Sequence, residues 1–323
     1  MAIQIGLFIL GLLVLYLGAE WLVKGSSRLA QALGVKPIVI GLTIVAFGTS
    51  SPEFVVSLLA ALKKSEGIAI GNIIGSNIAN VGLILGISAL VSPLKVELGV
   101  LRRELPVMIG VSLLFTVMLL DQKISFWNGL ILFSGLLGYI GYHFYNAMKV
   151  QKATDDFVLR SKANQKIDNE TTLDENGSRL ENTLLAIVGL ALLVGGANLM
   201  VRSGVLIARK VGVSEIVIGL TLVSVGTSLP ELATSVVSAR RKESDISVGN
   251  VIGSNIFNIM CVIGIVGMVA PLDVDRGLLF FELPVMLLFS VALFPLMKTG
   301  NVLNRIEGAI LLVGYGIFII CLF

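Results

Sequence analysis

The amino-acid sequence predicts an all-α membrane protein in which ten transmembrane helices form two inverted five-helix repeats, with broken helices at a central ion site. Three observations predict this fold class: an apolar composition, ten long apolar segments and an internal repeat. Of the 323 residues, 55% are hydrophobic and 14% charged, and the mean hydropathy is +0.94, which leaves too little polar surface for a soluble globule. The net charge of +3 is scattered, so nucleic acid is not expected as a partner.

Ten segments approach the length of about 20 mostly apolar residues that a membrane-spanning helix needs. The first starts at Met1 without a basic residue ahead of it and reaches Trp21 without a small-residue cleavage site, so we expect a span and not a removable signal peptide. Cys261 and Cys321 lie in apolar runs and indicate neither a disulfide framework nor a metal site. The predicted spans are 3–23, 36–62, 68–92, 100–120, 125–147, 182–202, 213–239, 246–270, 278–298 and 304–323.

One polar stretch separates the first five spans from the last five. It mixes acidic and basic residues and contains almost no aromatic residues, which predicts a flexible linker. The chain is therefore divided into a first repeat over residues 1–148, a linker over 149–180 and a second repeat over 181–323.

The two halves are copies of one unit, aligned without a gap at an offset of 178 residues. GLTIVAFGTSSPE, which ends at Glu53, and GLTLVSVGTSLPE, which ends at Glu231, are identical at 9 of 13 positions. GNIIGSNIAN, from Gly71, and GNVIGSNIFN, from Gly249, are identical at 8 of 10. Because each copy has an odd number of spans, the second enters the membrane from the opposite side, as in many secondary transporters.

The distribution of basic residues predicts the orientation. With the linker in the cytoplasm, that side holds 11 Lys and Arg residues besides the six of the linker, and the other side holds 7. The positive-inside rule therefore places the linker in the cytoplasm and both termini outside, in what we expect to be a prokaryotic plasma membrane.

The second span of each repeat is predicted to break near its middle. Pro52 and Pro230 each remove a backbone donor and clash with the carbonyl group four residues earlier, at Gly48 and Gly226. Carbonyl groups freed in this way cannot remain unpaired in hydrocarbon. With hydroxyl groups next to them, they favour a hard cation as the partner. These hydroxyl groups belong to Thr49, Ser50, Thr227 and Ser228.

Glu53 and Glu231 follow the two breaks at equivalent positions. A carboxylate at the centre of a span costs on the order of 3 kcal/mol, and no Lys or Arg lies within a helical turn of either residue. We therefore expect a bound cation or a proton as the counter-charge. The alternative is a protonated glutamate that serves only in packing.

The third span of each repeat contains GNxxGSNxxN. Its small residues recur every four positions, which allows another helix to approach closely. Ser76 and Asn80 share one helix face, as do Ser254 and Asn258, so their oxygen atoms can point together at a neighbouring helix. The alternative is that these polar groups only hold helices together.

These paired motifs, GTSxPE and GNxxGSNxxN, resemble the alpha repeats of sodium/calcium exchangers in the cation/calcium antiporter superfamily. The similarity extends over nearly the whole chain. The linker contains nothing like the large calcium-sensing domains of animal exchangers, so regulation of that type is not expected.

The resemblance implies a secondary active antiporter that exchanges Ca²⁺ for Na⁺ by alternating access, is electrogenic, and needs neither a cofactor nor an obligatory protein partner. Glu53 and Glu231 would be the calcium carboxylates, and the carbonyls of Thr49 and Thr227 would complete that site. Asn80 and Asn258 would line the centre. The flanking sodium sites would use the hydroxyls of Ser50, Ser76, Ser228 and Ser254 and the carbonyls of Ala46 and Ser224.

Two related activities are alternatives. Proton/calcium exchangers usually carry their glutamate in a GNxxE setting, so GTSxPE favours sodium over protons. Potassium-dependent relatives carry an aspartate where this chain has Asn258, so potassium transport is not expected. Some single-chain microbial members also carry an aspartate there, so the resemblance does not fix the number and placement of the sodium ions. An intramembrane enzyme would need a nucleophile with a base, or a metal cage, and a packing scaffold would bind no cation; neither is favoured by the paired glutamates.

Overall fold

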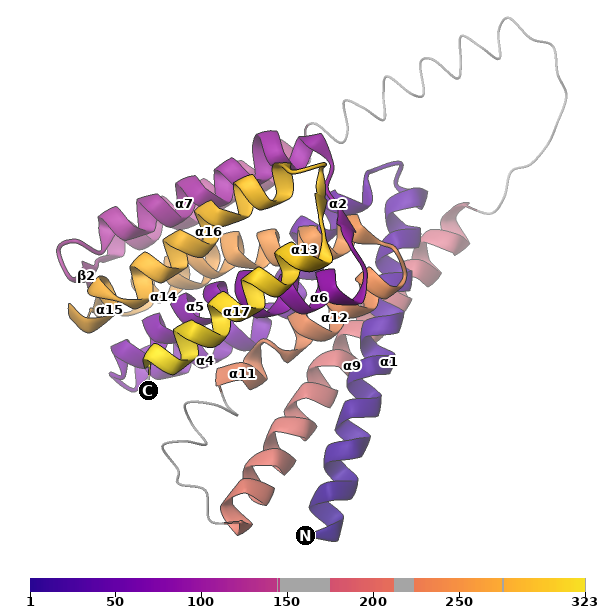
Figure 1. Ribbon diagram of the computed structural model, residues 1–323, viewed down its shortest axis with the longest axis horizontal. Helices are drawn as coiled ribbons and strands as arrows, with labels where there is room; N and C mark the ends of the chain where they lie inside the picture. Colours follow the sequence, from indigo (N-terminus) through magenta and orange to yellow (C-terminus); the bar gives the residue numbers. More distant parts are fainter. Residues whose placement is uncertain (144, 146–174, 212–223, 275, 323) are drawn as a thin grey trace, which may run out of the picture.

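The computed structural model describes residues 1–143, 145, 175–211, 224–274 and 276–322 (Figure 1). Most of the predicted linker, and the start of the seventh predicted span, lie outside these residues. All ten predicted spans contain helix within the described part of the chain, which confirms an all-helical membrane protein apart from four two-residue strands. The boundaries at 148 and 180 stay predictions.

The first repeat consists of five helical segments, several of which contain short π-helical stretches marked η. The fifth segment covers residues 126–143. The elements before it are α1 (Ala2–Ala32), α2 (Pro37–Ile40), η1 (Gly41–Val45), α3 (Ala46–Thr49), α4 (Ser51–Leu62), α5 (Glu66–Ala79), η2 (Asn80–Leu85), α6 (Gly86–Val91), β1 (Leu94–Lys95), η3 (Val100–Glu104), α7 (Leu105–Met118) and β2 (Lys123–Ile124).

Where it is described, the second repeat has the same order of elements, except that the α-helix α15 stands where the first repeat has the π-helix η3. Its elements are α9 (Glu175–Lys210), α11 (Ser224–Thr227), α12 (Leu229–Arg240), α13 (Ser244–Phe257), η5 (Asn258–Ile263), α14 (Gly264–Val269), β3 (Leu272–Asp273), α15 (Arg276–Phe280), α16 (Glu282–Lys298), β4 (Val302–Leu303) and α17 (Arg305–Leu322).

Among the described residues, six helices are long and apolar enough to cross a membrane, and the bent pair Pro37–Thr49 and Ser51–Leu62 makes seven. The remaining predicted spans, near 100–120, 125–147 and 213–239, also contain helix. The chain is therefore a multi-span integral membrane protein.

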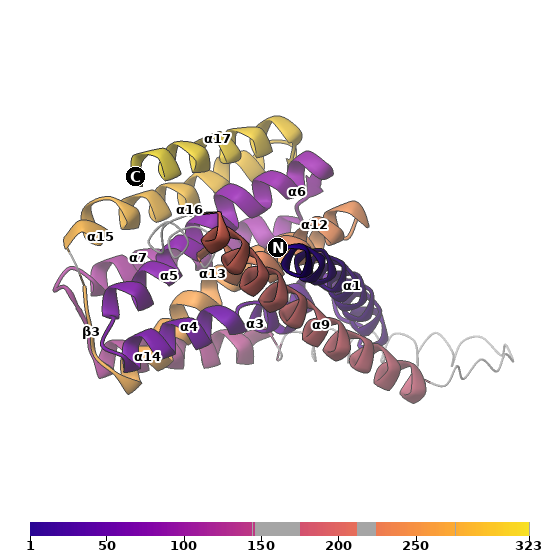
Figure 2. The ribbon, with the colours of Figure 1, turned by 90° about the horizontal axis from the view of Figure 1, so that it is seen from below.

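Helices α1 and α9 lie side by side along one flank of the molecule (Figures 1 and 2). They are antiparallel, because Gly11 near the start of α1 lies against Met200 near the end of α9, and Gly25 lies against Ala186. Their backbones approach so closely that a Cβ atom at Gly18 would lie 2.3 Å from the backbone nitrogen of Leu193. Since α1 and α9 begin the two repeats, their opposite directions agree with the predicted inversion.

The third spans of the two repeats form the centre of the core. Of the most apolar window of each span, 78% is buried for Glu66–Val91 and 89% for Ser244–Val269, against 28% for α1 and for α9. The main hydrophobic cluster joins residues of both third spans, including Ile73, Ile78 and Ile252. A separate cluster packs α1 against α9 through residues such as Leu22 and Leu193.

Two short antiparallel strand pairs connect the repeats. Strand β1 of the first repeat pairs with β4 of the second, and β2 of the first repeat pairs with β3 of the second. The sequence analysis did not predict these strands, because two residues are too few to show an alternating pattern.

Candidate ion-binding site

The predicted break in the second span is present in both repeats. In the first repeat, α3 and α4 meet at Ser50 (φ −81°, ψ 4°), and the chain bends by 43° there. In the second repeat, α11 and α12 meet at Ser228, whose backbone angles are nearly the same (φ −89°, ψ 6°). In both, the proline stands in the first turn of the following helix, where its missing N–H group leaves no helical bond unmade.

Glu53 and Glu231 occupy the first turns of α4 and α12. Each is only 1% exposed. The partial positive charge at the start of a helix stabilises a carboxylate placed there. The breaks therefore create new helix starts at the two buried glutamates. The Ala46 carbonyl, which was predicted to be free, accepts a hydrogen bond from the Ser50 N–H group at 3.0 Å.

Each glutamate is hydrogen-bonded to the serine of the opposite repeat. Ser50 Oγ donates to Glu231 Oε1 at 3.1 Å, and Ser228 Oγ donates to Glu53 Oε1 at 3.0 Å. The hydroxyl oxygen of Ser76 lies 3.2 Å from that of Ser228. The structure thus gathers side chains from three spans and both repeats into one buried cluster.

The remaining predicted ligands surround this cluster. Thr49 Oγ1 lies 3.0 Å from Asn250 Oδ1, and Ala46 packs against the backbone of Gly253, next to Ser254. Ser224 is the first residue of α11. The other predicted ligands are buried, namely Ala46, Thr49, Ser50, Glu53, Ser76, Asn80, Thr227, Ser228, Glu231, Ser254 and Asn258.

Asn80 and Asn258 begin the π-helical stretches η2 and η5. A π-helical turn carries an extra residue, is rare, and is frequent at functional sites. The sequence analysis singled out these asparagines but did not predict the π-helices, because the extra residue leaves no mark in the apolar pattern.

Two asparagines that the sequence analysis did not select hold the glutamate backbones. Asn72 Nδ2 donates to the carbonyl oxygen of Glu53 at 3.3 Å and to Ser57 Oγ at 3.0 Å. Asn250 Nδ2 makes the same two contacts in the second repeat, with the carbonyl of Glu231 and with Ser235 Oγ. Their identity between the repeats was the signal that could have identified them.

Several buried oxygen atoms without a hydrogen-bond partner belong to the predicted ligands. Among the described residues, nine buried side-chain oxygens lack a partner, and five of them are on predicted ligands. These five are Glu53 Oε2, Glu231 Oε2, Asn80 Oδ1, Asn258 Oδ1 and Ser254 Oγ. Buried polar groups are normally paired, so such a group of unpaired acceptors needs an explanation.

No described lysine, arginine or histidine forms an ion pair with Glu53 or Glu231. Two carboxylates with hydroxyl, amide and carbonyl oxygens around them form an all-oxygen set, which suits hard cations such as Ca²⁺. No group of three or more His, Cys, Asp or Glu side chains occurs in the described part of the chain, so a site for a transition metal is not indicated there.

A pocket of about 290 Å³ reaches the break from one side. It lies between α4 and α9, and Pro52, Thr227 and Asn198 are among its lining residues. Neither glutamate lines this pocket, but residues next to both breaks do.

The close helix approach predicted for the third spans is present at α13. A Cβ atom at Gly253 would lie 2.7 Å from the carbonyl oxygen of Leu42, and one at Gly249 would lie 3.0 Å from that of Ile38. The equivalent partner of Gly75 lies in residues 212–223, outside the described part.

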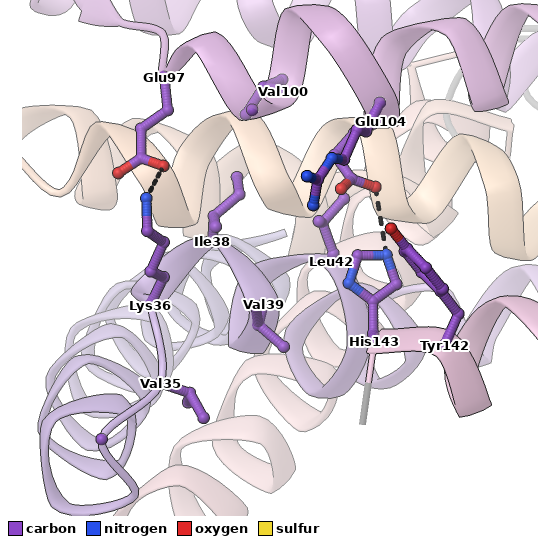
Figure 3. A pocket seen from close by; sticks show the side chains of 13 residues that line it. Val35, Lys36, Ile38, Val39, Leu42, Glu97, Val100, Glu104, Tyr142 and His143 are labelled. Carbon is purple, nitrogen blue, oxygen red and sulfur yellow. Dashed lines mark hydrogen bonds and ion pairs between the residues drawn. The ribbon is translucent and has the colours of Figure 1, made fainter. Parts of the chain in front are cut away.

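A second polar cluster lies apart from this site, at the edge of a pocket of about 240 Å³ (Figure 3). Glu104 Oε2 is 3.2 Å from His143 Nε2 and accepts a hydrogen bond of 2.8 Å from the Tyr139 hydroxyl. Glu104 and His143 are both buried. The sequence analysis did not connect these residues, and none of the predicted ligands lines this pocket.

Comparison with known proteins identifies the family. The family model described as "Sodium/calcium exchanger protein" matches residues 3–145 and 181–323. The chain belongs to the sodium/calcium exchanger family. It is therefore an ion transporter and not an enzyme, as the sequence motifs predict.

Relatives within the exchanger family match over nearly their full length. Sodium/calcium exchanger MaX1 of Methanosarcina acetivorans is 37% identical over 349 aligned positions, which cover 98% of this chain and 97% of the relative. Inner membrane protein YrbG of Escherichia coli K12 is 34% identical and covers 90% of this chain and 87% of its own length. A solved structure of the sodium-calcium exchanger NCX_Mj, soaked with 10 mM Na⁺ and zero Ca²⁺, superposes with a TM-score of 0.84 at 33% identity and covers 99% of both chains.

Proposed function

We propose that this exchanger carries Ca²⁺ and Na⁺ in turn at one central site, formed by the broken second spans and the third spans of both repeats. The observation that carries the proposal is the set of unpaired buried oxygens around Glu53 and Glu231. A bound cation would be the missing partner of these oxygens and would balance the negative charge of the two carboxylates. The NCX_Mj exchanger has been soaked with Na⁺, Ca²⁺ and Sr²⁺, and we infer that the same class of ions occupies this site.

Charge balance accounts for the exchange. One Ca²⁺ neutralises the two carboxylates, whereas three Na⁺ ions would leave one surplus positive charge. Both kinds of ion need the same oxygens, so they exclude each other. The proposed cycle is therefore electrogenic, and each surplus charge is worth about 2.3 kcal/mol per 100 mV.

The coupling of calcium and sodium movement follows from the free energy cost of burying the site without ions. Two carboxylates buried without a counter-ion are strongly unfavourable in a medium of low dielectric constant. The occluded state between the outward-open and inward-open forms is then reached only with ions bound. Net movement of calcium in one direction then requires movement of sodium in the other.

The distribution of basic residues supports the orientation, with the linker in the cytoplasm and both termini outside. We place the protein in a prokaryotic plasma membrane, with the lipid bilayer and the two ions as its partners.

Isotope flux in proteoliposomes tests the proposal. Vesicles loaded with sodium and diluted into sodium-free buffer with radioactive calcium are expected to take up calcium, and Glu53→Gln and Glu231→Gln are each expected to abolish the uptake. Glu66→Gln, at the start of α5 and outside the site, is the matched control and is expected to retain it.

The same assay separates the alternatives. Uptake driven by a pH gradient alone identifies a calcium/proton antiporter, and uptake that requires potassium together with sodium identifies the potassium-dependent activity. Uptake that ignores the sodium gradient contradicts the proposal.

A further inference from the structure

Four buried asparagines cross between the repeats at the centre of the core. They are Asn77 and Asn80 of the first repeat and Asn255 and Asn258 of the second, each at most 1% exposed. Asn80 and Asn258 are predicted ligands, and Asn77 and Asn255 are not. The contacts among the four amides determine which end of each ligand amide faces the ion.

The chain of contacts starts at a backbone carbonyl. Asn77 Nδ2 lies 3.4 Å from the carbonyl oxygen of Asn255 and 3.9 Å from the sulfur of Met286. Both neighbours only accept hydrogen bonds, so the end of the Asn77 amide that faces them must be the NH₂ group. Its oxygen therefore faces the other way, toward Asn258.

Asn258 takes its direction from that oxygen. Asn258 Nδ2 donates to Asn77 Oδ1 at 3.0 Å, which turns Asn258 Oδ1 away from Asn77. This oxygen is buried and has no hydrogen-bond partner among the described residues. It is the atom that is left to contact a cation.

The same contacts are present with the roles of the two repeats exchanged. Asn255 Nδ2 faces the carbonyl oxygen of Asn77 at 3.4 Å and the sulfur of Met108 at 3.6 Å. Asn80 Nδ2 donates to Asn255 Oδ1 at 2.9 Å, and Asn80 Oδ1 is again unpaired within the described chain. Both third spans thus direct one amide oxygen by the same route.

We propose that Asn77 and Asn255 are positioning residues that set the direction of the Asn258 and Asn80 amides, so that oxygen and not NH₂ is presented to the transported cation. The inference deepens the proposed function and rests on it. Its physical basis is electrostatic, because an amide oxygen attracts a cation and an NH₂ group repels it. Each repeat thereby positions a ligand of the other.

The test first removes the contact that directs the Asn258 amide and then replaces this amide by a carboxylate, whose two ends are alike. Asn77→Leu keeps the size of the side chain but removes the acceptor for Asn258, so the amide of Asn258 can turn. We expect the calcium concentration for half-maximal flux to rise about tenfold, since a buried group left without its partner changes affinity by that order. An aspartate at 258 has oxygen at both ends and needs no direction.

The two repeats supply matched controls. In the Asn77→Leu background, Asn258→Asp is expected to bring half-saturation to within about threefold of Asn258→Asp alone. Asn80→Asp adds the same carboxyl to the same site but leaves the Asn258 amide without the partner that directs it, so in that background half-saturation is expected to stay about tenfold above Asn80→Asp alone. In the Asn255→Leu background the expectation is reversed, because Asn255 directs Asn80. There, Asn80→Asp is expected to restore half-saturation and Asn258→Asp is not.

The outcomes separate the inference from general effects. If neither aspartate restores half-saturation, Asn77→Leu causes a packing defect. If both aspartates restore it, added charge is enough and the direction of the amide is not involved. Either result overturns the inference, as does unchanged half-saturation in Asn77→Leu. If Asn77→Leu does not fold, the Asn255→Leu series tests the same step. Wild-type vesicles without sodium-driven calcium uptake would contradict the proposed function instead, whatever the variants do.

Discussion

At the scale of single residues, the site is built from contacts that cross between the repeats. Ser50 holds Glu231, and Ser228 holds Glu53. Each carboxylate is therefore held in part by the other half of the chain. A change in one repeat is expected to act on the carboxylate of the other.

Ser50→Ala tests this crossed arrangement. The change leaves Glu231 Oε1 without its donor, at a cost of about 1 kcal/mol, so we expect the half-saturating calcium concentration to rise about fivefold. Ser228→Ala is expected to have the same effect through Glu53. Calcium dependence of isotope uptake is the measurement.

Ser51→Ala is the control for both variants. Ser51 is the next residue along the chain, but its hydroxyl donates to the carbonyl of Phe47 and not to a carboxylate. We expect its calcium dependence to match the wild type. Equal effects of Ser50→Ala and Ser51→Ala would mean that the break, and not the crossed hydrogen bond, is sensitive to the change.

The Glu104 cluster makes a prediction about stability. Glu104→Ala leaves the Tyr139 hydroxyl and His143 without their shared acceptor, and a buried group left unpaired costs about 1–3 kcal/mol. We expect the melting temperature in detergent to fall by several degrees. The equivalent Glu282→Ala is expected to lower it less, because Glu282 Oε2 has no hydrogen-bond partner among the described residues. Equal losses would show that the hydrogen bonds to Glu104 contribute little.

Sequence reasoning selected residues whose chemistry is unusual for their place and overlooked those whose chemistry is ordinary. A glutamate in the middle of a span stands out, so Glu53 and Glu231 were predicted. An asparagine next to a serine does not, so Asn77 and Asn255 were missed. The orientation of their amide groups depends on a backbone carbonyl in the other repeat, and a sequence pattern within one repeat does not reveal such a contact.

At the scale of elements, the breaks and the π-helices differ in how far the sequence predicts them. Proline fixes a break through local sterics, and the structure has the breaks at Ser50 and Ser228, two residues before each proline. The π-helical stretches η2 and η5 begin at Asn80 and Asn258, and no proline marks either start. They depend on how the third spans pack against the other repeat.

The antiparallel pair α1 and α9 makes a prediction at this scale. Gly18→Ala places a Cβ atom 2.3 Å from the backbone of Leu193, so the two helices must separate, at a cost of about 1–3 kcal/mol. Because neither helix carries a predicted ligand, we expect the rate of exchange to fall several-fold with little change in calcium affinity. Flux at saturating and subsaturating calcium separates the two quantities.

Gly6→Ala is the control on the same helix. No described atom lies within 4 Å of a Cβ atom at Gly6, so the change adds helix propensity without a clash. Exchange at the wild-type rate is expected. If Gly18→Ala raised half-saturation while leaving the maximal rate intact, the seam between α1 and α9 would serve binding and not the conformational step.

At the scale of the whole molecule, the proposed cycle predicts a current. In proteoliposomes adsorbed on a solid-supported electrode, calcium entry against sodium exit is expected to carry net positive charge in the direction of sodium flow, because three Na⁺ would replace one Ca²⁺. Reversing both gradients is expected to reverse the sign. Glu53→Gln vesicles provide the baseline, and full exchange without current would require two sodium ions per calcium.

The overall architecture was predictable from the sequence because the repeat is long and nearly gapless. An offset of 178 residues with five spans per copy left only the inverted arrangement, and the opposite directions of α1 and α9 agree with it. The pairing of β1 with β4 and of β2 with β3 could not be predicted. Strands of two residues owe their existence to neighbours brought together by the helices.

Those strand pairs also bear on ancestry. Every described strand finds its partner in the other half, so a lone half would be left with open edges at both of its strands. Two identical halves inserted in opposite senses would close those edges reciprocally, as a self-complementary dimer does. A gene of half this length, whose product enters the membrane in both orientations, would suffice to build the architecture, and its fusion would lock the two orientations into one polypeptide.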